Sequence, residues 1–511
     1  MPTMTSQRQK IDDFLQKLIF ALFNILVFAT PFVFTWFNQE LFEFNKMIVV
    51  YLFTSLILAI WAGRSLIRKQ LLWKNRTHNY LVALFFFSQL LSTIFSMHQR
   101  TSIFGYYTRF NGGLLSIIAY LALFFAAQYN LSKKQLNLIL KNLLFAALLI
   151  SLYAIPEHFG HSLSCLIVTG KYNVACWVQD VQNRVFATFG QPNWLAGFLL
   201  MTIPLAIWQI WQAMHNQGKK KTRWPIIFNL LLLFLLVTAL FFTKSRSGLL
   251  ALGVALLVQI IAEKFLQNKK KDKKLSLPQL ISPLVVVVIV FLLFGRELSL
   301  SRPNQSIFSF LTEGLEVNNG NGEEISAPMI TEGGSKSSDI RKVVWQGALK
   351  VWQRYPIFGS GVETFAYSYY RDRPVEHNLL SEWDFLYNKA HNELLNFLAT
   401  TGVVGLATYL ALFVALLIYL IKLWRTQQLS SQKIALSVAL LAMFISNFFG
   451  FSTVTTNLLF SIFAAAIVKE TVTWPKITTA RLGWPEYLIA VAILLILTVV
   501  NKSIWQIWRA V

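Results

Sequence analysis

Long apolar runs constrain this chain more than any other feature of its sequence. Runs of about 17 to 25 apolar residues recur along it, and that length crosses roughly 30 Å of hydrocarbon at about 1.5 Å per helical residue. Lipid cannot satisfy open backbone groups, and the strands of a membrane barrel would alternate polar and apolar residues. The sequence therefore predicts an all-α polytopic membrane protein with about 12 to 13 transmembrane helices. We expect them near 15–37, 47–67, 80–96, 113–129, 136–155, 193–214, 224–243, 247–266, 278–295, 394–424, 432–449, 454–469 and 485–506.

The basic residues indicate how these helices are oriented. The chain carries 46 Lys and Arg against 23 Asp and Glu. Basic clusters such as 219–223 and 269–274 fall on one side of the predicted topology, and such clusters gather on the cytoplasmic side. We therefore expect a cytoplasmic N-terminus and a first helix that is retained rather than cleaved. No loop combines this charge with aromatic stacking residues, so nucleic acid is not an expected partner.

Two long connections, 156–190 and 296–390, lie on the outer side of this topology. The first holds the only two cysteines, Cys165 and Cys176. An oxidising outer compartment would permit a disulfide between them, with two unpaired thiols as the alternative. In the second, 303–338 has the composition of a flexible flap, and apolar residues then recur at helical spacing, with Asp339 as the expected N-cap.

Polar residues in three outer turns are candidate ligand contacts. The hairpin TKSRSG places Lys244 and Arg246 at the membrane boundary, where snorkelling of the basic side chains is the structural alternative. The stretch NRVFATFGQPNWLAG contains Arg184 and Asn193, and its proline is expected to start a helix. The loop GYYTRFNGG sets Arg109 between aromatic residues, which an interfacial aromatic belt would also explain.

The stretch YNKAHNELLNFLATTGVVG, at 387–405, is expected where the second long loop re-enters the membrane. His391 in it titrates near neutrality and lies on the same side as the outer arginines, so it is a candidate general base; a surface or capping histidine is the alternative. Asn392 and Glu393 stay open between capping the following helix and orienting the imidazole.

The order of these motifs resembles the bacterial O-antigen ligase superfamily, which includes O-antigen polymerases and protein O-oligosaccharyltransferases. The resemblance rests on SRSG at 245–248, W-x-x-A-L-x-x-W at 345–352, P-x-x-G-x-G-x-x-x-F at 356–365 and AHNELLNFLATTGVVG at 390–405. RVFATFGQPN is also similar, although Gln191 stands where that family more often has Asn. The resemblance spans roughly 180–450. It divides the chain into N-terminal helices with the first outer loop (1–180), a ligase-like core (181–450) and C-terminal helices (451–511).

The resemblance implies transfer of a glycan from an undecaprenyl-diphosphate carrier to an acceptor hydroxyl at the outer face, without a metal or other cofactor. His391 would be the general base, and Arg246 and Arg341 would hold the diphosphate. Substrate contacts are expected from Arg184, Lys244, Asn193, Arg109, Asn392 and Glu393. Fixed guanidinium charges suit a departing diphosphate, and no Asp-x-Asp pair for a metal is visible in the outer loops.

The acceptor stays open between a lipid, a growing glycan and a protein. A second enzyme hypothesis is a lipid-phosphate-sugar glycosyltransferase that uses Glu40 or Glu43 in the first outer loop. A flippase for lipid-linked sugars is a third hypothesis, but it expects midplane charges and internal repeats that the sequence does not show. A membrane scaffold gives no reason for arginines and a histidine to lie on one side.

Overall fold

The computed structural model describes residues 2–74, 76–216, 223–269, 275–300, 335 and 337–469, together with scattered positions from 484 to 508. All regular elements in these described residues are helical. In chain order they are α1 (Pro2–Ala29), η1 (Thr30–Phe32), α2 (Glu43–Arg68), α3 (Thr77–Ile94), α4 (Gln99–Phe104), α5 (Leu114–Asn130), α6 (Lys133–His158), α7 (Leu163–Thr169), α8 (Pro192–Asn216), α9 (Trp224–Phe242), α10 (Arg246–Lys269), α11 (Leu277–Leu300), α13 (Ser337–Arg354), α14 (Phe365–Asp372), η2 (Val375–Leu379), α15 (Glu393–Arg425), α16 (Ser431–Asn447) and α17 (Val454–Val468).

The prediction of an all-α polytopic membrane protein is confirmed. Eight of the described helices are long and apolar enough to cross a bilayer, and α5, α16 and α17 are shorter apolar helices. Twelve of the thirteen expected segments fall on described helices. The expected helix at 485–506 lies outside the continuously described ranges, and so does the expected flap at 303–338 except for position 335 and its last two residues, which begin α13.

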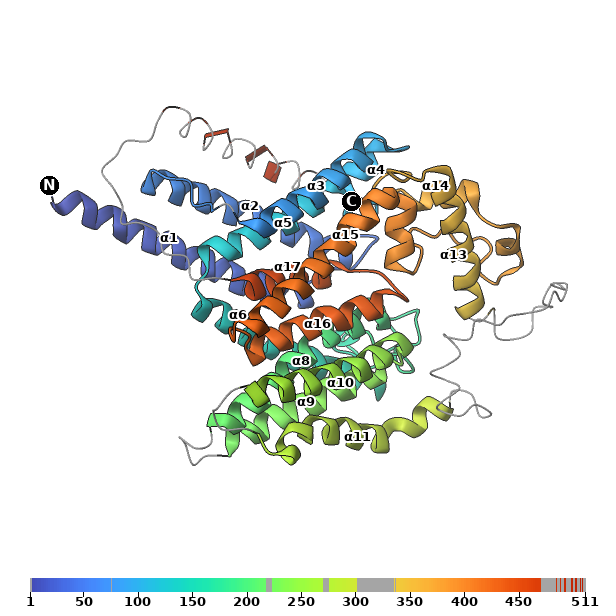
Figure 1. The fold of residues 1–511 in the computed structure, drawn as a ribbon. Helices are drawn as coiled ribbons and strands as arrows, with labels where there is room; N and C mark the ends of the chain where they lie inside the picture. Colours follow the sequence, from blue (N-terminus) through green and yellow to red (C-terminus); the bar gives the residue numbers. More distant parts are fainter. Residues whose placement is uncertain are drawn as a thin grey trace.

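The long helices lie side by side in one bundle, and the small helices α13 and α14 gather at one end of it (Figure 1). We call this the site end. Helix α8 is the central element, with its span almost wholly buried against α9, α10 and α16. Two further pairs pack closely, α3 with α15 and α5 with α17. Helix α13 packs on α15, so the segment after the long loop is fastened directly to the bundle.

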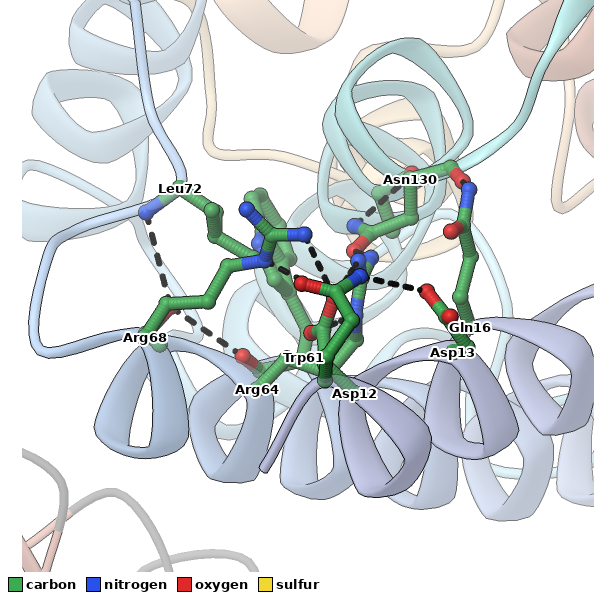
Figure 2. A network of polar contacts seen from close by, with 11 residues as sticks. Asp12, Asp13, Gln16, Trp61, Arg64, Arg68, Leu72 and Asn130 are labelled. Carbon is green, nitrogen blue, oxygen red and sulfur yellow. Dashed lines mark hydrogen bonds and ion pairs between the residues drawn. The ribbon is translucent and has the colours of Figure 1, made fainter. Parts of the chain in front are cut away.

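A buried ion cluster joins α1, α2 and α5 (Figure 2). The carboxylate of Asp12, which is fully buried, accepts hydrogen bonds from Arg64 Nε at 2.8 Å and Arg68 Nε at 2.8 Å. The same Arg64 guanidinium donates to Asn130 Oδ1 at 2.6 Å. Two guanidinium groups thus converge on one carboxylate that water does not reach, which fixes α1 and α2 to the end of α5.

We expect Asp12→Asn to destabilise the protein by about 3–5 kcal/mol, because it leaves two buried guanidinium groups without their counter-charge. Chemical unfolding of the detergent-solubilised protein measures this loss. Asp13→Asn is the matched control, since the Asp13 carboxylate contacts only Gln9 at the exposed surface and its loss should change stability by less than about 0.5 kcal/mol. Equal stability of the two variants would contradict the assignment.

Candidate functional site

His391 lies one residue before the cap of α15. The Asn392 side chain accepts the Leu395 backbone N–H at 3.0 Å, so it is the N-cap of the helix. His391 itself has φ 51°, a left-handed conformation that turns its side chain out of the helical path. The imidazole packs edge-on against the rings of Tyr387 and Phe451, with centroid separations of 5.7 Å and 5.5 Å.

The surroundings of His391 favour a neutral imidazole. Burial and, to a smaller extent, the positive charges of Arg341 and Arg109 together lower its pKa from 6.5 to about 4. No described residue forms a hydrogen bond with the ring. A neutral imidazole with an available nitrogen can accept a proton at any pH near neutrality.

Arg341, whose charge acts on His391, lies in a cluster of three arginines from separate segments. Arg184 precedes α8, Arg246 is the first residue of α10, and Arg341 is the fifth residue of α13. The pKa of Arg341 lies below its ordinary value, first because of burial and then because of Arg184 and Arg246. The pKa of Arg184 is lowered by burial and by Arg246. Guanidinium groups that repel one another in this way favour the binding of an anion between them.

The hairpin between α9 and α10 holds Arg184 in place. Arg184 Nε donates to the Thr243 carbonyl at 3.1 Å, and its Nη2 makes a long contact of 3.5 Å with Asn193 Oδ1. Lys244 Nζ donates to Asn183 Oδ1 at 2.6 Å. Pro192 starts α8, as the sequence predicts. Asn193 and Lys244 therefore support the loop that carries Arg184.

Arg109 reaches the same region from the loop between α4 and α5. Its guanidinium carbon lies 5.1 Å from the centre of the Trp194 ring and 5.8 Å from that of Phe451. Stacking on aromatic faces is a favourable environment for a guanidinium. Phe451 thus lies between Arg109 and His391, and sequence reasoning did not identify it, because a lone Phe in an apolar chain carries no local signal.

Glu393 and Ser452 fasten the segment that carries Phe451. Both oxygens of the Glu393 carboxylate accept from Ser452, one from its backbone N–H and one from its hydroxyl, each at 2.9 Å. From α2, Glu43 Oε2 accepts the Val454 N–H at 2.7 Å. Two carboxyl groups from distant helices thus fix the short connection between α16 and α17, which carries Phe451.

We expect Phe451→Leu to lower the turnover of this site by about 10- to 100-fold, because the smaller side chain lets His391 and Arg109 shift from their working positions. The Michaelis constant and the unfolding midpoint should change little. Phe449→Leu, a substitution of the same size in the same connection, is the control. An equal loss in both variants would show a general packing effect instead.

The glycine motif at 356–361 docks on α15 where that helix is interrupted. Ser360 N and Gly361 N donate to the carbonyls of Ala399 and Thr400 at 3.0 Å and 2.9 Å. Gly402 has φ 67°, and a Cβ there would lie 2.2 Å from the Ile357 carbonyl oxygen, so only glycine fits.

This docking brings Glu363, which follows the motif, next to the segment before α15. Its carboxylate pairs with Lys389 Nζ at 2.5 Å. The two side chains are largely buried, with exposed fractions of 6% for Glu363 and 14% for Lys389. The pair ties the glycine motif to the residue two positions before His391.

Some expectations change in the structure. Helix α13 begins at Ser337, so Asp339 lies in its first turn and the prediction of an Asp339 N-cap is wrong.

Cys165 and Cys176 are joined by a disulfide, with Cα atoms 5.3 Å apart. The carboxylate of Glu40 accepts the Phe44 N–H at 2.6 Å, so like Glu43 it supports a backbone segment. Within the described ranges, no three His, Cys, Asp or Glu side chains form a metal-binding group.

The fold and the site together define a polytopic helical membrane protein with a neutral histidine and clustered arginines at one end of its bundle. Residues 231–410, roughly a third of the chain, match the family model described as O-Antigen ligase. This match supports membership in the O-antigen ligase superfamily, whose members are glycosyltransferase- or ligase-type enzymes. A comparison with curated proteins finds no match. The matched segment contains Arg246, Arg341 and His391, whereas Arg109, Arg184 and Phe451 lie outside it.

Proposed function

We propose that the protein is a membrane glycosyltransferase that moves a glycan from an undecaprenyl-diphosphate carrier to an acceptor hydroxyl. The observation that carries the proposal is the pairing of a neutral histidine with a cluster of cations. His391, whose pKa is lowered to about 4, is neutral near pH 7 and so is able to accept a proton, and Arg184, Arg246 and Arg341 form a site for phosphate oxygens. The match to the O-Antigen ligase family model supports the same reaction type.

The proposed step is a substitution at the anomeric carbon of the donor glycan. The acceptor oxygen forms a new bond to this carbon while the bond from the carbon to the diphosphate oxygen breaks. The bonding electron pair leaves with the diphosphate, and the acceptor proton passes to the free imidazole nitrogen of His391. Arg246 and Arg341 stabilise the charge that grows on the leaving diphosphate, a type of contribution worth several kcal/mol.

The location and the partners of the reaction belong to the same proposal. The site end would face the periplasm or exterior of a bacterial inner membrane, with the N-terminus in the cytoplasm. Arg109, Asn193 and Lys244 would support substrate contacts around Arg184 and His391. The reaction would need no divalent metal, because arginines supply the positive charge.

The test uses the purified protein in lipid nanodiscs with an undecaprenyl-diphosphate glycan and candidate acceptors, in the presence of a chelator. Formation of a glycosylated acceptor together with undecaprenyl diphosphate is the expected result. A strict requirement for a divalent ion would overturn the metal-free mechanism. Transfer that depends on Glu40 and Glu43 but survives loss of His391 would favour the carboxylate enzyme hypothesis.

The pH profile follows from the depressed pKa of His391. Because its pKa lies near 4, the imidazole stays neutral down to that pH, and kcat/KM should be flat from about pH 7.5 to pH 5 and fall below about pH 4. An ordinary histidine would lose activity below about pH 6.5. Replacing Arg109 by Gln removes one nearby cation, so the inflection should move upward. Lys342→Gln, at an exposed position, should leave it unchanged. An inflection near pH 6.5 in the wild type would contradict this assignment.

A further inference from the structure

A buried carboxyl group lies near the end of α10 that is farther from Arg246. Glu263 is 1% exposed, and its Oε1 accepts hydrogen bonds from Ser431 Oγ at 2.8 Å and Gln267 Nε2 at 3.3 Å. Its Oε2 is buried and has no hydrogen-bond partner among the described residues. No described Lys, Arg or His forms an ion pair with Glu263. A buried acid without a described counter-charge in a membrane helix marks a candidate ion site.

A second unpaired oxygen lies one helical turn away from Glu263. Gln259 is also 1% exposed, and its Nε2 donates to the Pro204 carbonyl of α8 at 2.9 Å. Because a carbonyl can only accept, this contact fixes the orientation of the amide and leaves Gln259 Oε1 without a partner among the described residues. Residues four apart share one face of a helix, with Cβ atoms about 5–6 Å apart. Gln259 and Glu263 thus place two unpaired acceptors on one buried face of α10.

Neighbouring groups from three helices fix the position of these two side chains. Gln267 Oε1 accepts the Leu275 N–H at 3.1 Å, so the amide of Gln267 turns its donor toward Glu263. Ser431 is the first residue of α16, and its hydroxyl ties that helix to α10. The Pro204 carbonyl joins α8 to Gln259. The two unpaired oxygens therefore lie where α8, α10 and α16 pack together.

Two acceptors without a donor favour a positive charge between them. Buried polar groups are almost always paired, and burying a carboxylate is costly unless a counter-charge accompanies it. Carboxylate and amide oxygens are the ligands that hard cations prefer. A single carboxylate balances one monovalent ion, whereas calcium sites usually collect several carboxylates. The short distance between two side chains one turn apart favours a small ion, and sodium combines small size with a single charge.

We propose that the junction of α8, α10 and α16 binds one sodium ion through Glu263 Oε2 and Gln259 Oε1, with water as the remaining ligands. The ion neutralises the buried carboxylate and holds the three helices together. From Arg246 to Glu263 helix α10 rises by roughly 26 Å, so the ion lies far from the arginine cluster and takes no part in the chemistry proposed there.

The first experiment follows thermal unfolding of the purified full chain in detergent, in sodium chloride or in choline chloride at the same ionic strength. Sodium should raise the unfolding midpoint of the wild type by about 2 °C or more along a saturating curve, because an ion that binds only the folded state stabilises it by mass action. Equal midpoints in the two salts would overturn the proposal. A midpoint that responds to pH but not to sodium would also overturn it, because a proton would then bridge the two oxygens.

Three variants connect the sodium response to this junction. The amide introduced by Glu263→Gln can donate to Gln259 Oε1 directly, so this variant should unfold near the wild-type midpoint and should no longer respond to sodium. Gln259→Met removes one ligand oxygen and should raise the sodium concentration needed for half of the effect about tenfold or more. Glu376→Gln, at an exposed carboxyl group in η2, is the control and should keep the full response. A sodium response that persists unchanged in Glu263→Gln or in Gln259→Met would contradict the assignment.

The second experiment measures binding directly and needs neither unfolding nor turnover. Equilibrium dialysis against radioactive sodium should find close to one ion per chain in the wild type and almost none in Glu263→Gln. His391→Ala and Arg341→Ala should bind sodium as the wild type does, because both residues belong to the site end of the bundle. Absence of bound sodium in the wild type, or wild-type binding in Glu263→Gln, would overturn the inference. No glycan takes part in this measurement, so its outcome is independent of the proposed function.

Discussion

Replacing His391 by Ala is expected to lower the rate of glycan transfer by about 10²- to 10⁴-fold, the usual contribution of a positioned general base. The imidazole is the proposed proton acceptor, and its pKa of about 4 keeps it neutral at physiological pH. Binding of the diphosphate donor should change little, because the arginines that would hold it come from other helices. Rate measurements at saturating donor and acceptor therefore report the loss directly.

Two further variants make the His391 result specific. His391→Gln keeps a polar side chain but offers no comparable base, so it should be nearly as impaired as His391→Ala. His161→Ala is the matched control, since His161 is an exposed histidine that stacks on Tyr172 in the disulfide-containing loop. We expect it to retain full activity. Wild-type rates in His391→Ala would reject the general-base role, whatever the behaviour of the arginines.

Most of the bundle could be predicted from the sequence, because the local run of apolar residues is enough to identify each membrane helix. An apolar run of bilayer length leaves the backbone little choice, which is why the predicted segment at 394–424 and the observed α15 nearly coincide. Helix ends were harder to place, because several side chains compete for the same role. Asp339 is of a residue type that often forms an N-cap, but α13 begins two residues earlier, so Asp339 lies in its first turn.

The candidate site could be predicted only in part, because the sequence does not reveal which outer turns meet. Motif order suggested His391, Arg246 and Arg341, and the mutual pKa effects place these side chains near one another. Phe451 acquires its importance from contacts with residues far away in the sequence. The same holds for Glu363, whose pairing with Lys389 depends on the glycine motif docking at the interruption of α15.

Glu40 and Glu43, which the sequence suggested as catalytic carboxylates, instead have structural roles. Glu43 is buried and accepts the first backbone N–H of α17, which fixes the connection that carries Phe451. Glu40 caps the start of α2. A carboxyl group engaged with a backbone donor in this way is poorly placed to bind a sugar. The histidine hypothesis therefore gains support from the positions of the competing residues.

Replacing Arg341 by Ala is expected to lower kcat/KM by about 10²- to 10³-fold, the range seen when one fixed donor to a developing negative charge is removed. Arg341 lies at the start of α13 and makes no ion pair with any described residue. Burial and the two neighbouring arginines lower its pKa, and phosphate oxygens bound beside it would offset this repulsion. Arg341→Lys should recover only part of the activity, because an ammonium group lacks the planar pair of donors that matches phosphate.

The control for Arg341 is its neighbour Lys342, whose side chain is half exposed and lies 4.0 Å from Asp339. Lys342→Ala removes one positive charge from the same helical turn and should leave kcat/KM within about twofold, because exposed charges contribute little. The double variant Arg184→Ala/Arg341→Ala sharpens the test. If both arginines hold one diphosphate, removing the first also relieves repulsion on the second. The fold-loss of kcat/KM in the double variant should then be smaller than the product of the fold-losses in the two single variants. Fully multiplicative losses would mean that the two side chains act on separate groups, and equal activity of Arg341→Ala and Lys342→Ala would remove Arg341 from the site.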